Sequence, residues 1–268
     1  MIKNFIVDRV VRGNMYSHKT GELLWSLNQI TNPSLSMESE TVDAVDALGT
    51  PIMSFDRSKS CTFSAENAIF DLTLLGEQVG QAAKEGTTII PMFESFDVEA
   101  DGGVITLSNE PATDYPVTFI YVLEKDGSLG NQLVESKHAE ANPEDYADAL
   151  TFTVDDTDTK KITLPADIKA GSRVFVSYEY EGNATYVINS ANKFPTAGRF
   201  VMEVLGRDVC DATTEIYAML VLHNAKLSAS TEVTFDTEMT QGFELTAQQD
   251  YCSKDNLLFT LIIPEDEE

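Results

Sequence analysis

The stretch ALGTPIMSFDRSKSCTFSAENAIFDLTLLGEQVGQAA, residues 47–83, decides the fold because it combines a turn, a strand and the one long helix that the sequence predicts. Leu48-Gly49-Thr50-Pro51 is a turn signal, and Cys61 and Phe63 follow it with the i, i+2 spacing of one strand face. We therefore expect a strand that leads directly into a helix.

The helix is predicted over Asn67–Ala83, where apolar residues recur every three to four positions. Ser64 or Asn67 can cap its start, Asp71 adds negative charge near that end, and Gly86 follows the last periodic residue. The residues expected to pack this helix against its neighbour are Ile69, Leu72, Leu75 and Val79. A single amphipathic helix in a β-rich chain is expected to lie against a sheet or to cover its edge.

The rest of the chain predicts strands, so the fold class is mostly β. Residues 1–100 and 191–268 are predicted to form one sheet system with the flanking helix. Short strands separated by turns fill residues 101–190, which predicts an inserted β module of immunoglobulin-like type. Two consecutive domains are the alternative.

The charge is unusual, with 44 acidic against 18 basic residues and a formal net charge of −26. Such a field opposes tight binding to a phosphate backbone, which requires clustered Lys and Arg. A protein that touches nucleic acid without adhering to it is compatible with this charge, as is an abundant protein that the charge keeps soluble.

The three cysteines, Cys61, Cys210 and Cys252, have no metal-like spacing and are expected to be buried, reduced thiols. The first residues, MIKNFIVDRVVRG, lack the apolar core of a signal peptide, and no apolar run approaches the roughly 18 residues of a membrane span. The sequence thus predicts a soluble protein made in the cytoplasm, with no contact with a membrane.

No catalytic, cofactor or metal site is predicted. His18, His138 and His223 lie in three different segments, and no nucleotide-binding, hydrolase or zinc motif occurs. The run Asp155–Asp158 resembles part of a calcium loop but lacks the following Gly and the distal Glu, which favours a solvated turn. A carbohydrate-active enzyme is the alternative from another class, and it requires a deep cleft with two close carboxylates.

The order of segments resembles the major tail (tail tube) proteins of long-tailed bacteriophages. The resemblance is carried by LLWSLNQITNPSLSMES, the acidic segment that follows it, residues 49–80, and the ending from Phe200 to Ile263. It implies a β-sandwich or barrel with one flanking helix, a long loop between early strands, and an added immunoglobulin-like module. Here the loop would span Glu38–Leu48 and is expected to be flexible.

The resemblance also implies a function: a virion structural protein that forms rings, usually of six copies, which stack into the tube for DNA ejection. Six copies would carry about −156 charges per ring, and an acidic wall lets DNA slide past without adhering. Its partners would be itself and other tail or capsid proteins. A capsid-decorating or other accessory virion protein is the alternative.

The expected contacts between copies lie in the first strand and in the acidic loop. They are Ile2, Phe5, Val7, Glu38, Glu40, Val42, Asp43, Val45, Asp46 and Leu48.

Overall fold

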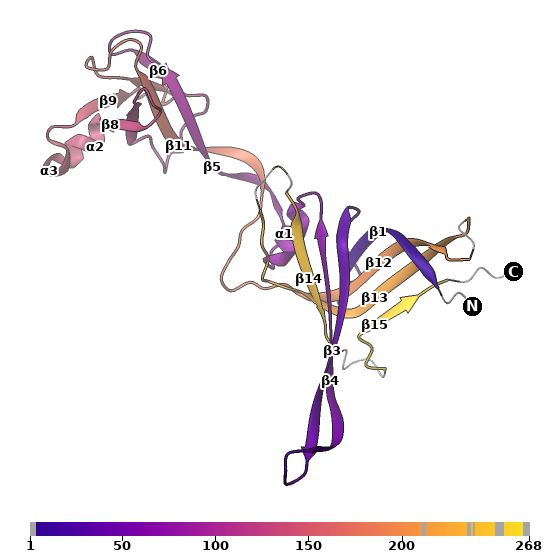
Figure 1. Ribbon diagram of the computed structural model, residues 1–268. Coiled ribbons are helices and arrows are strands. Elements are labelled where there is room, and N and C mark those ends of the chain that lie inside the picture. Colours follow the sequence, from indigo (N-terminus) through magenta and orange to yellow (C-terminus); the bar gives the residue numbers. More distant parts are fainter. Residues whose placement is uncertain (1–3, 211–212, 235–236, 238, 250–254, 265–268) are drawn as a thin grey trace. The chain divides into compact units, whose positions relative to one another are not determined.

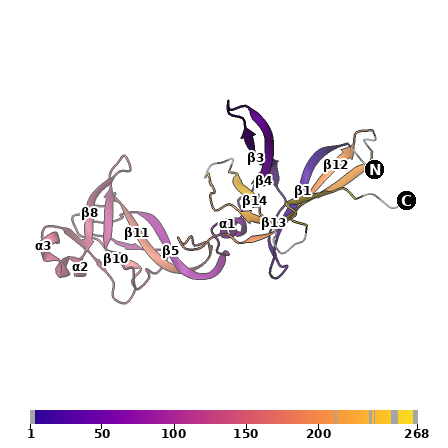
Figure 2. The same ribbon diagram turned by 90° about the horizontal axis from the view of Figure 1, so that it is seen from below.

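The computed structural model describes residues 4–210, 213–234, 237, 239–249 and 255–264. It confirms a mostly β protein, with 56 % of the chain in strands and a few short helices (Figures 1 and 2). The chain divides into two compact units: residues 1–84 with 186–268, and residues 85–185. In the described part of the chain, no helix is long and apolar enough to cross a membrane.

The first unit is built on one curled sheet with strand order β2-β1-β12-β13-β14-β4-β3, and β15 pairs with β13 beside β14. Its elements are β1 (Phe5–Ser17), β2 (Leu23–Leu27), β3 (Ile30–Val45), β4 (Pro51–Asn67), α1 (Leu72–Gln78), β12 (Ala197–Asp208), β13 (Glu215–Leu227), β14 (Gln241–Ala247) and β15 (Phe259–Ile262). The sheet curls into a half-barrel, so that its two ends face each other across a hydrophobic core.

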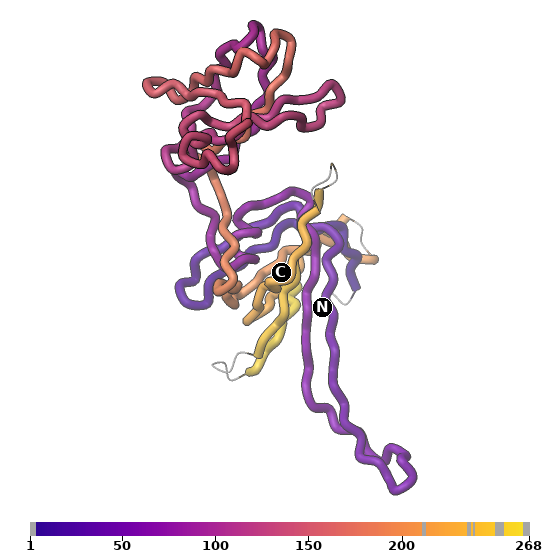
Figure 3. Tube along the Cα trace, turned by 90° about the vertical axis from the view of Figure 1, so that its left-hand side faces the viewer, coloured from indigo at the N-terminus to yellow at the C-terminus, as the bar shows by residue number. Residues whose placement is uncertain are grey.

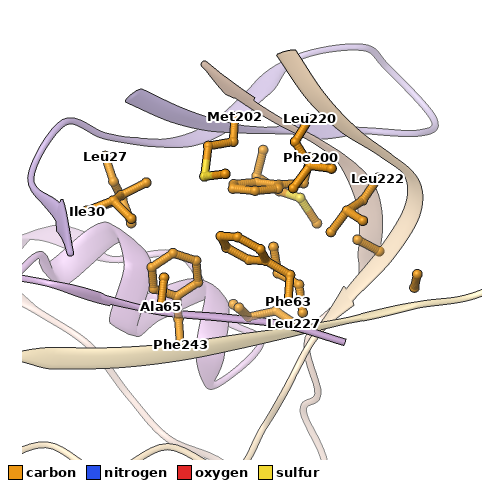
Figure 4. Close-up of a cluster of buried hydrophobic side chains, with 14 of the residues drawn as sticks. Leu27, Ile30, Phe63, Ala65, Phe200, Met202, Leu220, Leu222, Leu227 and Phe243 are labelled. Carbon is orange, nitrogen blue, oxygen red and sulfur yellow. The ribbon is translucent and has the colours of Figure 1, made fainter. Parts of the chain in front are cut away.

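Aromatic rings fill this core. In Figure 4, Phe63 of β4 and Phe243 of β14 point toward Phe200 and Met202 of β12. The Phe63 and Phe200 ring centroids are 5.3 Å apart, and Trp25 of β2 lies 5.6 Å from both Phe200 and Phe243. Tilted and edge-on ring pairs of this kind add about 0.5–1.5 kcal/mol each beyond their area burial. The half-barrel is therefore held closed by contacts between its opposite ends.

The helix is much shorter than predicted. It begins after Asp71, whose Oδ1 accepts hydrogen bonds from the backbone N–H groups of Thr73 at 2.7 Å and Leu74 at 2.9 Å. The segment before it is not helical because β14 pairs with β4 as far as Asn67. At the other end Gly80 has φ +74°, and a Cβ there would lie 2.4 Å from the backbone of Phe194.

None of the four residues predicted to pack the helix against its neighbour is fully buried. Ile69 precedes the helix and is exposed, while Leu72, Leu75 and Val79 are only half-buried. The side chain that α1 buries completely is Leu74, which packs in the core of the half-barrel.

The prediction of a flexible loop at Glu38–Leu48 is also wrong. Residues 38–45 continue β3 and pair with the first half of β4, as far as Val45 opposite Pro51. Figure 3 shows the result as a long two-stranded hairpin that extends beyond the rest of its unit.

The second unit has a sheet with strand order β5-β11-β7-β8-β9-β10-β6. Its elements are β5 (Lys84–Asp97), β6 (Val104–Thr106), β7 (Phe119–Leu123), β8 (Leu129–Glu135), α2 (Ser136–Ala141), α3 (Pro143–Tyr146), β9 (Leu150–Val154), β10 (Lys161–Thr163) and β11 (Arg173–Tyr186). The chain enters this unit along β5 and leaves it along β11. Residues 85–97 of β5 thus belong to the second unit.

One feature of the second unit departs from an immunoglobulin domain. β8 and β9 run parallel, with α2 and α3 between them in the sequence, whereas immunoglobulin sheets are antiparallel. The core of this unit is separate from the first and gathers buried side chains such as Ile120, Phe152 and Val174.

Candidate assembly surfaces

The described residues offer no arrangement for metal chemistry, since no group of three or more His, Cys, Asp or Glu side chains could hold an ion. The His138 ring packs against the rings of Phe119 and Tyr146, and His223 Nε2 lies 2.7 Å from Thr260 Oγ1. Asp155 Oδ1 accepts hydrogen bonds from the N–H groups of Thr157 and Asp158, as in the predicted turn. These side chains hold local structure together.

The cysteines differ in their surroundings. Cys61 is buried in β4, and burial raises the pKa of its thiol. Cys210 is exposed, contrary to the expectation of a buried thiol, and Cys252 lies outside the described residues.

A cavity of about 570 Å³ lies in the second unit. Several of its polar side chains already bind one another or nearby backbone: Lys137 pairs with Asp156, and Glu135 accepts a hydrogen bond from the N–H of His138 at 2.8 Å.

The most distinctive surface is the long hairpin, which we call the arm and define as residues 37–60 of β3, β4 and the turn between them. All of its residues are exposed. Its turn is well ordered by hydrogen bonds: Asp46 Oδ1 accepts from the N–H groups of Thr50 and Leu48, each at 2.8 Å. These bonds, first that of Thr50 and then that of Leu48, lower the pKa of Asp46.

One face of the arm carries an apolar strip. The strand register places Val42 opposite Phe55 and Ala44 opposite Met53, so the four side chains share one face. Val42, Met53 and Phe55 are 44 %, 56 % and 45 % exposed. Apolar side chains that gather on a projecting hairpin, away from any core, mark a surface that contacts another molecule.

The arm also carries carboxylates. Glu38 and Glu40 lie on the same face as the strip, nearer the base of the arm, while Asp43 lies on the opposite face with its Oδ1 accepting from Ser54 Oγ. The arm therefore combines apolar and acidic groups.

Apart from the outer edges of the terminal strands β2 and β3, the first unit has uncovered strand edges on β1 and β15 among the described residues. The Phe5–Arg12 part of β1 pairs with β12 on one side only, because β2 joins β1 from Gly13 onward. On β15, Phe259–Ile262 pairs with β13 on one side only. Ile6 and Leu261, on these strands, are 64 % and 53 % exposed. Unpaired strand edges are ready to pair with another chain.

A projecting arm and two open edges on a curled sheet are the features expected of an assembling subunit. A family model described as the YomU/Tube protein family matches residues 4–256. The chain belongs to the YomU/Tube protein family. Membership of a tube family agrees with the tail-tube resemblance of the sequence and implies a structural rather than an enzymatic role. No curated protein shows significant sequence similarity to the chain.

In this YomU/Tube chain the residues predicted as subunit contacts lie in two places. Phe5 and Val7 are on the open edge of β1, and the residues from Glu38 to Leu48 are on the arm and its turn. Phe5 is half-buried and packs against the core, whereas Val7 is 54 % exposed. Ile2 lies outside the described residues.

The sequence predicted a strand after the turn at Leu48–Pro51, but neither the apolar residues of that strand nor the edge of β15 were predicted as contact surfaces. Met53 and Phe55 complete the apolar strip, and their i, i+2 spacing after Pro51 was an available strand signal. The edge of β15 gave no comparable signal, because which strand ends at an edge depends on the pairing of the whole sheet.

Proposed function

We propose that this protein builds a tail tube by self-association into rings, of six copies each, that stack on one another. The observation that carries this proposal is the presence of the arm and two open edges on one unit of a YomU/Tube family member. It would then be a component of the virion tail that assembles after synthesis in the host cytoplasm.

Within a ring, the open edges supply the contact. The β1 edge of one copy and the β15 edge of the next can pair, which continues the sheet from copy to copy. Because these are two different surfaces, the contact is head-to-tail, and repeating it by rotation closes a ring. Ring closure also removes exposed edges, which otherwise promote aggregation.

The arm supplies a second contact, with a copy that does not pair through the sheet edges. Its strands project beyond the core of their own unit (Figure 3). Val42, Met53 and Phe55 of its apolar strip are about half exposed, with the Arg57 guanidinium 5.9 Å from the centroid of the Phe55 ring. Docking of the arm on a neighbour would bury this strip and fix the position of one ring on the next.

The outward face of β3, β4 and β14 is the surface best suited to line the bore. The strand register places Glu66 and Glu244 on it, among hydroxyl side chains. Between Ser34–Glu40, Ser58–Glu66 and Gly242–Thr246, the side chains on this face include no Lys or Arg. Such a wall repels the DNA phosphates, so that DNA passes without adhering.

The unit at residues 85–185 has its own core and is inserted between the two halves of the first unit. We propose that it is an added module that meets other tail or capsid proteins. A capsid-decorating protein would use this module alone and would bind bare capsids without forming tubes.

The test is assembly of the purified chain, followed by light scattering and negative-stain electron microscopy. The wild type is expected to form rings or tubes at high concentration. A variant with residues 41–57 replaced by Asn-Gly joins Glu40 to Ser58, which already face each other, through a two-residue turn. It should keep the Trp25 emission of the folded unit and lose stacking. A wild type that stays monomeric, or a shortened arm that stacks normally, would contradict the proposal.

A further inference from the structure

We propose that the arm of one copy docks on a particular surface of a second copy, the outward face of β1, β12 and β13. We call this surface the arginine face, after the four residues Arg9, Arg12, Arg199 and Arg207. The inference rests on the proposed self-association and adds the place where the arm is received.

The arginine face concentrates positive charge in an acidic chain. It holds four of the chain's six arginines, although the formal net charge is −26. The register places Arg9 opposite Leu205, Arg12 opposite Glu203, and Arg199 opposite Tyr16. The alternate residues of β12, Phe200, Met202 and Val204, are buried in the core, so the four arginines lie on the other side of the sheet and are exposed.

Three carboxylates lie on or beside this face. Arg9 Nη1 lies 3.9 Å from Asp8 Oδ2, Arg12 Nε lies 2.9 Å from Glu203 Oε2, and Glu215 lies opposite Arg207. Four arginines and three carboxylates leave this face with a small net positive charge, in contrast with the carboxylates of the face of β3, β4 and β14.

The arm has the complementary charge. Its acidic residues are Glu38, Glu40, Asp43, Asp46 and Asp56, and its basic residues are Arg57 and Lys59. The arm is therefore net negative, and attraction to the arginine face would orient an approaching copy.

Apolar groups match as well. Ile6, Tyr217 and Ile262 lie on the outward side of the sheet and are 64 %, 45 % and 46 % exposed. They can receive the strip of Val42, Ala44, Met53 and Phe55. Arginine and tyrosine beside apolar groups are the side chains that contribute most to protein interfaces.

The two surfaces also have similar lengths. At roughly 3.3 Å per strand residue, Glu38 to Val45 spans about 23 Å and Arg199 to Arg207 about 26 Å. One arm can therefore lie along the whole row of arginines.

The test reverses the charge of the arm in one variant and the charge of the arginine face in another. An arm-reversed variant carries E38K and E40K, the two acids on the same face of the arm as the strip, and a face-reversed variant carries R9E, R199E and R207E. Arg12 is kept because it pairs with Glu203, and Asp46 is kept because it orders the turn. Each variant alone brings like charges together, so each should raise the critical concentration for assembly by at least about tenfold.

An equimolar mixture should restore assembly. The reversed arm of one variant then meets the reversed face of the other, and the unchanged arm meets the unchanged face. We expect the mixture to assemble at about the wild-type concentration and to contain both variants in equal amounts. A control with E99K and E140K, two exposed acids of the second unit, has the same charge change as the arm-reversed variant and should assemble as the wild type does.

Several outcomes would overturn the inference. One is normal assembly of the face-reversed variant alone. Another is a mixture that stays unassembled while both variants keep wild-type Trp25 emission and circular dichroism. A third is binding of a DNA duplex by the wild type that the R9E, R199E and R207E changes abolish without affecting assembly, which would assign the face to nucleic acid. If the wild type itself does not assemble, the proposed function falls together with this inference, whereas failure of the exchange alone removes only the inference.

Discussion

Phe55→Ala should weaken assembly strongly and leave the folded chain nearly unchanged. Phe55 is 45 % exposed on the apolar strip, and this exposed part is the area that docking of the arm would bury. Taking about 200 Å² for the side chain gives about 90 Å², which at about 25 cal/mol per Å² amounts to about 2 kcal/mol. A loss of about 2 kcal/mol corresponds to about a 30-fold rise in the critical concentration.

The assay is sedimentation or light scattering across a concentration series, with Trp25 emission as the measure of folding. Trp25 is the only tryptophan and is 3 % exposed in the core of the first unit, so its emission reports on that unit alone. Phe93→Ala is the control, because Phe93 is 66 % exposed on β5, in the second unit, where its ring stacks on Phe175. A critical concentration for Phe55→Ala within about threefold of the wild type, or an equal rise for Phe93→Ala, would refute the reasoning.

Three further predictions concern the first unit. Phe243→Ala should lower its free energy of unfolding by about 3–5 kcal/mol, measured by urea titration of Trp25 emission, because the ring is 4 % exposed between Trp25 and Phe63. Gln241→Leu should cost about 2–4 kcal/mol in the same titration, since it leaves the Asp71 N–H and Gln78 Oε1 without their buried partner; a loss below about 1 kcal/mol would contradict this. Glu77→Gln should raise the melting temperature at pH 7: burial raises the pKa of Glu77, so its charged form destabilises the fold once the pH rises through that pKa. The gain should vanish near pH 3.5, where Glu77 is protonated in both the folded and the unfolded chain.

The parts of the fold that the sequence predicted are those with one buried face. Cys61 and Phe63 were assigned to one strand face from their spacing, and both are buried in β4. On β12, Phe200 and Met202 alternate with more exposed residues in the same way. Where one face of a strand packs on a core, every second residue is apolar, and this alternation can be recognised in the sequence.

The arm could not be recognised by that pattern. Both faces of residues 38–45 are exposed, so no core selects alternate apolar residues, and the acidic composition favoured a loop. The strand forms there because β4 pairs with it for its whole length. The one indication of the arm in the sequence was the strand predicted after Pro51, which pairs with residues 38–45.

The helix was overestimated for a related reason. Apolar residues between Ile69 and Val79 fit a helical period, but that period does not show where strand pairing stops. Pairing with β14 holds the chain extended to Asn67, and the close approach of Phe194 requires the left-handed conformation at Gly80. Both limits come from residues distant in the sequence.

The assembly surfaces were predicted only in part. Val7 and the arm residues were proposed from the resemblance to tail-tube proteins, whereas the arginine face emerges only when the register brings Arg9 and Arg12 beside Arg199 and Arg207. These arginines are nearly 200 residues apart in the chain, so their shared surface depends on the pairing of β1 with β12.

The most direct measurement of the central claim is electron microscopy of the concentrated wild-type protein. We expect rings of subunits with an open bore, stacked into tubes, and an axial repeat that is set by the arm. A solution that holds only single chains by light scattering at the same concentration, with no rings or tubes on the grid, would contradict the claim.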